Sequence, residues 1–91
     1  MLFWSRTEYG WAVNLDGTDA ASGFALPRVE LRSSPRGWLC ACHLPDGMSR
    51  TVTLGYPAGV GEAMRLAIEG SLGAFRGQHA AGLRALLAAR H

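Results

Sequence analysis

The stretch Val29–Leu54, VELRSSPRGWLCACHLPDGMSRTVTL, contains two turn signals, SPRGW at Ser34–Trp38 and LPDGM at Leu44–Met48. Each signal combines a proline, one polar residue and a glycine, which are residue types that favour tight turns. Apolar and polar side chains alternate around both turns, as is typical of strands with one buried face. The stretch therefore predicts two hairpins that belong to one antiparallel meander.

The register of the LPDGM hairpin follows from the length of its loop. Pro45-Asp46-Gly47 fits a three-residue loop in which a type I turn is followed by a left-handed glycine. The predicted cross-strand pairs are Leu44 with Met48, Cys42 with Arg50, Cys40 with Val52, and Trp38 with Leu54.

The register of the SPRGW hairpin is selected by burial. An equally short loop would place Arg32 on the face of Cys40 and divide the apolar side chains between the two faces of the sheet. A four-residue loop, Ser34 to Gly37, removes this conflict. The predicted pairs are then Ser33 with Trp38, Leu31 with Cys40, and Val29 with Cys42. One face becomes apolar and carries Val29, Leu31, Trp38, Cys40, Cys42, Leu44, Val52 and Leu54. The other becomes polar and carries Arg28, Glu30, Arg32, Leu39, Ala41, His43, Ser49, Thr51 and Thr53.

Two more strands are predicted before these hairpins. Residues Tyr9–Leu15 alternate between apolar and small or polar side chains, and Asp16-Gly17 closes this strand. Residues 23–33, GFALPRVELRS, predict a second strand with a bulge or bend at Pro27. That defect would return Phe24 and Leu26 to the apolar face.

Helices are predicted after Pro57, where the apolar residues recur at helical spacing. An amphipathic helix is expected over about residues 58–75, with a second short helix after a left-handed glycine at Gly77. The apolar positions of the two helices are Val60, Met64, Ala67, Ile68, Leu72 and Phe75, and Ala80, Leu83, Leu86 and Leu87. The predicted fold class is α+β. It is a single domain over residues 1–91, with an antiparallel sheet of three to four strands and one face covered by one or two C-terminal helices.

The composition restricts the classes of partner. The chain has 91 residues and is 48% hydrophobic, which allows a core without metal or disulfide support. Its formal charge is only +2, and all nine basic residues are arginines, which favour planar bidentate contacts over a diffuse phosphate backbone. No signal-peptide core or bilayer-spanning apolar run is present, which predicts a cytoplasmic protein with reduced cysteines and no membrane contact.

Residues that could carry chemistry have structural interpretations. Cys40 and Cys42 share the apolar face, lack a second ligand pair at zinc-site spacing, and point away from His43. They are interpreted as buried small side chains. The aspartates lie at turn positions, and no nucleophile–base or paired-carboxylate arrangement is recognisable. The sequence predicts no metal, no cofactor and no enzymatic activity.

Arginines on the polar face are the candidate binding residues. Arg28 and Arg32 lie on the predicted strand and Arg36 at its turn, with His43 beside them. They form either an ordinary solvated face or a patch for a carboxylate or phosphate group of a partner. Trp4 has no place in the predicted sheet. It either folds over the sheet edge or forms an exposed hot spot for a partner.

Residues 38–70, WLCACHLPDGMSRTVTLGYPAGVGEAMRLAIEG, resemble the strand–strand–helix half of a double-stranded-RNA-binding domain. Members of that family place lysines at the start of this helix to bind phosphates. The matching residues 59–63 contain no cation, and the first one follows at Arg65. The resemblance implies RNA binding, and this departure removes the family's phosphate contacts.

The whole chain is also similar in size and layout to small phage-encoded anti-CRISPR proteins, several of which are meanders with helices. That resemblance implies a non-enzymatic protein that blocks a nuclease or surveillance complex by docking on its surface. The leading hypothesis is accordingly an inhibitor that binds a larger protein or ribonucleoprotein complex. The alternatives are a nucleic-acid-binding module, and a homodimer formed through an edge strand, as in an antitoxin.

Overall fold

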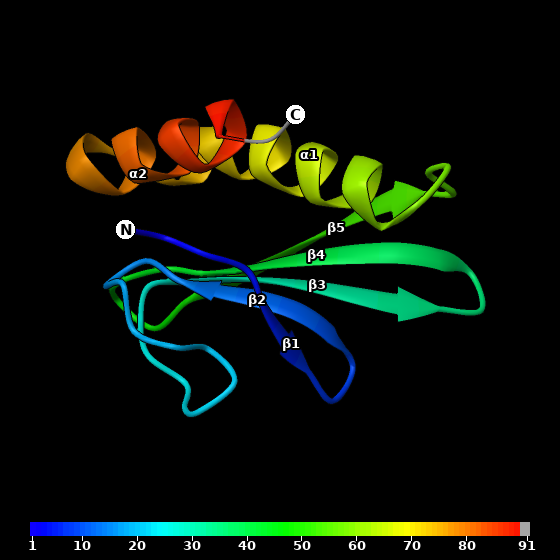
Figure 1. Ribbon diagram of the computed structural model, residues 1–91, viewed down its shortest axis with the longest axis horizontal. Coiled ribbons are helices and arrows are strands. Elements are labelled where there is room, and N and C mark those ends of the chain that lie inside the picture. The colour runs from blue at the N-terminus through cyan, green and yellow to red at the C-terminus, as the bar shows by residue number, and fades with distance from the viewer. Residues whose placement is uncertain (90–91) are drawn as a thin grey trace.

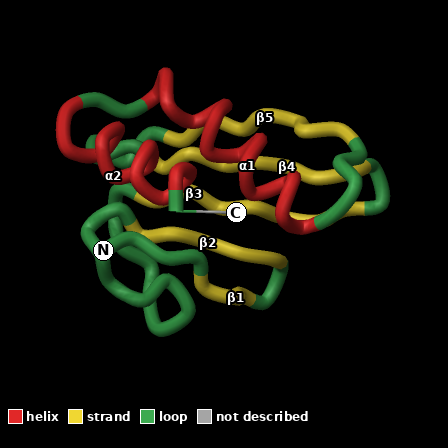
Figure 2. The backbone as a smooth tube through the Cα atoms, turned by 45° about the horizontal axis from the view of Figure 1, so that its top comes forward, coloured by secondary structure: helices red, strands yellow, loops and turns green. Residues whose placement is uncertain are grey.

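The computed structural model describes residues 1–89 and shows a five-stranded antiparallel sheet followed by two helices (Figure 1). The strands follow the chain order β1-β2-β3-β4-β5, so the predicted meander and α+β class are confirmed (Figure 2). The elements are β1 (Ser5–Thr7), β2 (Gly10–Asn14), β3 (Arg28–Ser34), β4 (Gly37–His43), β5 (Ser49–Gly55), α1 (Val60–Ser71), a 3₁₀ turn (Leu72–Ala74) and α2 (Gly77–Ala88). The sheet has five strands where three to four were predicted. The additional strand is β1, whose three residues are too few to show an alternation of apolar and polar side chains.

The predicted registers of both hairpins are confirmed over most of their length. The loop expected over Ser34 to Gly37 is shorter, because Ser34 pairs with Gly37 and only Pro35 and Arg36 connect the strands. β3 and β4 pair Ser33 with Trp38, Leu31 with Cys40, and Val29 with Cys42. β4 and β5 pair Cys42 with Arg50 and Cys40 with Val52. The predicted pair of Trp38 with Leu54 is wrong, since Trp38 pairs with Gly55. The left-handed backbone of Gly55, with φ of 75°, accompanies a bulge that leaves Leu54 as an extra residue in β5.

Both helices lie on the apolar face of the sheet (Figure 1). Val29 and Leu31 are completely buried there, together with Ile68 of α1 and Leu83 of α2. The predicted first helix is shorter than expected, because α1 ends at Ser71 and a 3₁₀ turn follows. Phe75 then has extended backbone and is buried. Gly77 has the predicted left-handed conformation, with φ of 60°.

One predicted core position, Val52, is exposed. α1 crosses the sheet diagonally and leaves part of β5 uncovered (Figure 2). Val52 consequently keeps 45% of its surface exposed, although it lies on the helix side opposite Cys40. The helices therefore protect the middle of the sheet better than its β5 edge.

The loop between β2 and β3 folds beneath the face that is turned away from the helices, here called the outer face (Figure 1). The N–H of Leu15 donates to the carbonyl of Pro27 at 2.8 Å and closes this loop at the sheet. β3 begins only at Arg28, so Phe24 and Leu26 are not part of the strand. The expectation that Phe24 returns to the apolar face is wrong, because its ring packs against His43 and Arg28 on the outer face. Leu26 does lie on the helix side, where it lines a cavity together with Leu15 and α2. Both side chains lie in the loop and are exposed.

Among residues 1–89, neither helix has the length and apolar character that crossing a bilayer requires.

Candidate interaction surface

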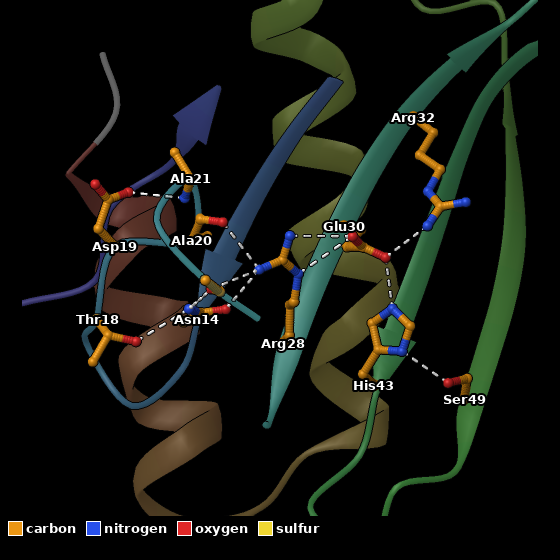
Figure 3. A network of polar contacts seen from close by, with 11 residues as sticks. Asn14, Thr18, Asp19, Ala20, Ala21, Arg28, Glu30, Arg32, His43 and Ser49 are labelled. Carbon is orange, nitrogen blue, oxygen red and sulfur yellow. Dashed lines mark hydrogen bonds and ion pairs between the residues drawn. The ribbon is translucent and has the colours of Figure 1, made fainter. Parts of the chain in front are cut away.

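The outer face is organised around the carboxylate of Glu30, in the middle of β3 (Figure 3). Arg28 Nη2 lies 3.2 Å from Glu30 Oε2, and Arg32 Nη2 lies 3.0 Å from Oε1. His43 Nε2, from β4, lies 2.7 Å from the same Oε1. The strand alternation that buries Val29 and Leu31 on one face thus gathers these polar side chains on the other.

Arg28 connects the β2–β3 loop to the sheet. Its Nη1 donates to the side chain of Asn14 at 3.0 Å and to the loop carbonyls of Ala20 and Gly23 at 3.2 and 3.3 Å (Figure 3). Only 5% of Arg28 is exposed. The expectation that Arg28 is available on a solvated patch is therefore wrong, because the loop covers its guanidinium and uses its donors.

His43 is also largely enclosed. Its Nδ1 lies 2.8 Å from the hydroxyl of Ser49, and the ring of Phe24 packs edge-on at 5.1 Å between centroids. The same Phe24 ring lies 4.9 Å from Arg28 Cζ. Phe24 thus covers two of the predicted binding residues, Arg28 and His43. The imidazole of His43 contacts Glu30 and is largely shielded from solvent.

A cleft of about 350 Å³ opens on the outer face beside this network. Its floor is Arg28, Glu30 and Arg32, and its walls come from the β1–β2 turn and the β2–β3 loop. The exposed residues that line it include Arg32, with half of its side chain exposed, Tyr9 at 65%, Phe24 at 60%, and the acidic Glu8 of the β1–β2 turn. Arg32 Cζ lies 5.9 Å from the Tyr9 ring. We call Tyr9, Phe24 and Arg32 the rim cluster.

The other two predicted binding residues lie elsewhere. Arg36 is exposed in the β3–β4 turn and does not line the cleft. Trp4, ahead of β1, is partly buried against the helix-side core, and its indole N–H is buried without a partner among the described residues. Of the five predicted residues, Arg28, Arg32 and His43 come together, and Tyr9 and Phe24 were missed as their companions.

Cys40 and Cys42 are free and buried beneath α1, as their interpretation as small core residues predicted. Their sulfur atoms lie 3.5 and 3.2 Å from the Ser71 hydroxyl, which donates to the Ala67 carbonyl at 2.6 Å. A hydrogen bond with Cys42 and burial together raise the pKa of the Cys40 thiol. Within residues 1–89, no three or more His, Cys, Asp or Glu side chains group as metal ligands would.

The carboxyl group of Glu30 is held ionised. Burial alone would raise its pKa, but the hydrogen bond with His43 and the charges of Arg32 and Arg28 outweigh burial and hold the pKa below its usual 4.5. A carboxyl whose pKa is lowered by folding stabilises the fold above its unfolded-state pKa. That contribution is lost as the pH falls below about 4.5 and through the folded-state pKa.

We expect the substitution Glu30→Gln to lower the free energy of unfolding by about 2–3 kcal/mol at pH 7, since two arginines lose their anionic partner. The difference from the unmodified protein should shrink when urea unfolding is repeated below about pH 4.5, because the Glu30 carboxyl then binds a proton when the chain unfolds. Glu69→Gln is the matched control, because Glu69 forms an exposed pair with Arg65 at 2.9 Å. Its removal should cost less than about 0.5 kcal/mol. A pH-independent difference at Glu30 would contradict the assigned ionisation.

Comparison of the chain with protein-family models finds no match, and comparisons with curated proteins and with solved structures likewise find none.

Proposed function

We propose that this protein is a non-enzymatic binding domain that docks its outer sheet face onto a larger protein or ribonucleoprotein complex and blocks it. The rim cluster carries this proposal. Arginine and tyrosine are enriched among the residues that dominate binding energy at protein interfaces, and exposed aromatic side chains supply apolar contact area there. Tyr9, Phe24 and Arg32 expose most or half of their side chains around one cleft.

The network beneath the rim cluster supports docking through preorganisation. Glu30 holds the guanidinium of Arg32 at 3.0 Å, and Arg28 fixes the loop that carries Phe24. Side chains that are already oriented lose less conformational entropy when a partner binds. The guanidinium nitrogens of Arg32 that do not bond Glu30 could bind a carboxylate on the partner. Apolar side chains of the partner next to that carboxylate would then contact Tyr9 and Phe24.

A nucleic-acid partner receives less support from this surface. The guanidinium of Arg28 donates to groups inside the protein and is not available to a phosphate. The first turn of α1 carries the acidic Glu62 where a phosphate-binding helix would carry a cation. Binding that depends on phosphate contacts would weaken steeply with added salt. Salt dependence thus separates this alternative from protein docking.

The test is affinity capture from a cell extract with the protein immobilised through its N-terminus, with and without nuclease. We expect Tyr9→Ala combined with Arg32→Ala to remove the captured complex, with the melting temperature lowered only slightly because both side chains are exposed. Arg84→Ala, an exposed arginine of α2 on the other side of the sheet, is the matched control and should capture normally. If the unmodified protein, the double variant and the Arg84→Ala control all captured the same proteins, docking through the rim cluster would be refuted.

A further inference from the structure

β5 forms one edge of the sheet and pairs with β4 alone. The N–H of Leu44 donates to the carbonyl of Met48 at 2.8 Å, which makes these residues a hydrogen-bonded pair. In an antiparallel ladder such pairs alternate with pairs that exchange no hydrogen bond. Arg50 and Val52 therefore bond to β4. The N–H and C=O groups of Ser49, Thr51 and Thr53 point away from the sheet.

Nothing in the described part of the chain covers these backbone groups. All residues from Met48 to Thr53 are exposed. Sheet edges are usually protected by short strands, prolines, or several charges. The opposite edge, β1, is only three residues long, whereas β5 has seven residues, one charge at Arg50, and no proline. β5 is therefore open to pairing with another strand.

We propose that two copies of the chain pair through β5 in antiparallel orientation, around a two-fold axis at Thr51. The regular part of β5 before the bulge, Ser49–Thr53, is centred on Thr51. Superposing two such segments aligns Thr51 with Thr51, Ser49 with Thr53, and Arg50 with Val52 of the second copy. Each aligned pair of outward-pointing residues exchanges two hydrogen bonds. The two five-stranded sheets become one continuous sheet.

The side chains fit this pairing on both faces. On the outer face, hydroxyl-bearing residues meet one another, and Thr–Thr and Thr–Ser pairs across strands are favourable. On the helix side, the aliphatic stem of Arg50 lies over the exposed Val52 of the second copy. No two like charges face each other directly. Because the segment is complementary to itself, a second copy fits it better than an arbitrary strand.

The interface is small, so the dimer should be weak. Five residues a side bury less than the roughly 1,200–2,000 Å² of a standard stable interface, which favours a dissociation constant in the micromolar range. The dimer contact also lies apart from the rim cluster, which comes from the β1–β2 turn, the β2–β3 loop and β3. Failure of one proposal therefore leaves the other intact.

The test is sedimentation velocity of the full chain between about 5 and about 500 μM. We expect the mass to rise with concentration from the 9.7 kDa of one chain towards twice that value. A chain that stays monomeric over the whole range would overturn the proposal, and β5 would then be open only to a strand of another protein.

Two lysine substitutions test the position of the axis. Thr51→Lys places two positive charges opposite each other at the two-fold and should weaken the dimer at least about tenfold. Thr53→Lys is the matched control on the same face and strand, and it places its charge opposite an uncharged serine. We expect it to change the dissociation constant less than about threefold. Equal weakening by both, with circular dichroism unchanged, would refute the axis at Thr51.

A third variant should strengthen the dimer. Val52→Glu places a carboxylate opposite Arg50 of the second copy, twice in each dimer, on a residue that is already exposed. Sedimentation should show tighter association that weakens as salt is added. Dissociation caused by this variant in low salt would contradict the proposed register.

Discussion

Replacing Arg28 with methionine should lower the free energy of unfolding by about 3–5 kcal/mol, the range measured when one partner of a buried ion pair is removed. The methionine fills much of the arginine's volume but restores none of its hydrogen bonds. Asn14 and the carbonyls of Ala20 and Gly23 lose a donor, and Glu30 loses one of its cations. The β2–β3 loop loses both hydrogen bonds that Arg28 donates to its carbonyls and keeps the one from Asn14 Nδ2 to the Gly23 carbonyl, at 2.9 Å.

Arg32→Met is the matched control for Arg28→Met. Arg32 pairs with the same carboxylate, but half of its side chain is exposed and it bonds no loop carbonyl. Its replacement should cost about 1 kcal/mol or less in the same urea titration. Equal effects of the two substitutions would show that the loop is held by something other than Arg28. Substitutions at Arg28 should therefore be interpreted through stability and not through partner binding.

The hairpins could be predicted because burial and turn chemistry are local in the sequence. A slip of one residue would have exposed Val29 and Leu31 and buried Arg32, so only one register kept the apolar face continuous. Helix periodicity likewise located α1 and α2, although the helix ends differ from prediction. The one register error, at Trp38, arises from a bulge at Gly55 whose backbone conformation no side-chain pattern encodes.

The outer face could not be predicted in the same way, because its cover comes from a loop without periodicity. Alternation correctly assigned Arg28, Glu30 and Arg32 to one face, but it says nothing about what lies over that face. The loop is positioned by hydrogen bonds from Arg28 to main-chain carbonyls, and every residue type offers such a carbonyl. Phe24 was consequently assigned to the wrong face.

β1 was missed for a different reason. Its three residues pair with β2, where Ser5 meets Ala12 and Arg6 meets Trp11. Arg6 Cζ also lies 5.3 Å from the Trp11 ring. These contacts join residues of two strands across a turn, and a polar triplet carries no sign of them. Trp4, immediately before β1, is thereby brought against the core. Of the two alternatives for Trp4, packing over the sheet or forming an exposed hot spot, the structure shows packing.

The second large effect is expected at Gly37, where β4 begins. Its φ of 109° lies in the region that side chains other than glycine rarely adopt. A Cβ atom at this position would also collide with the carbonyl oxygen of Gly55 in the neighbouring strand. Gly37→Ala therefore combines backbone strain of about 1–2 kcal/mol with a displacement of β5 that costs about 1–3 kcal/mol more.

Gly77→Ala separates these two contributions. Gly77 also has a positive φ, of 60°, but apart from its chain neighbours and the backbone of its own helix no atom lies within 4 Å of the position a Cβ would take. We expect Gly77→Ala to lower the free energy of unfolding by about 1 kcal/mol, and Gly37→Ala by about 3 kcal/mol or more, in parallel urea titrations. Amide hydrogen exchange should increase in β5 for Gly37→Ala alone, because only that substitution pushes β5 away from β4. Similar losses for both glycines would mean that backbone strain, and not the close approach of the two strands, makes Gly37 necessary.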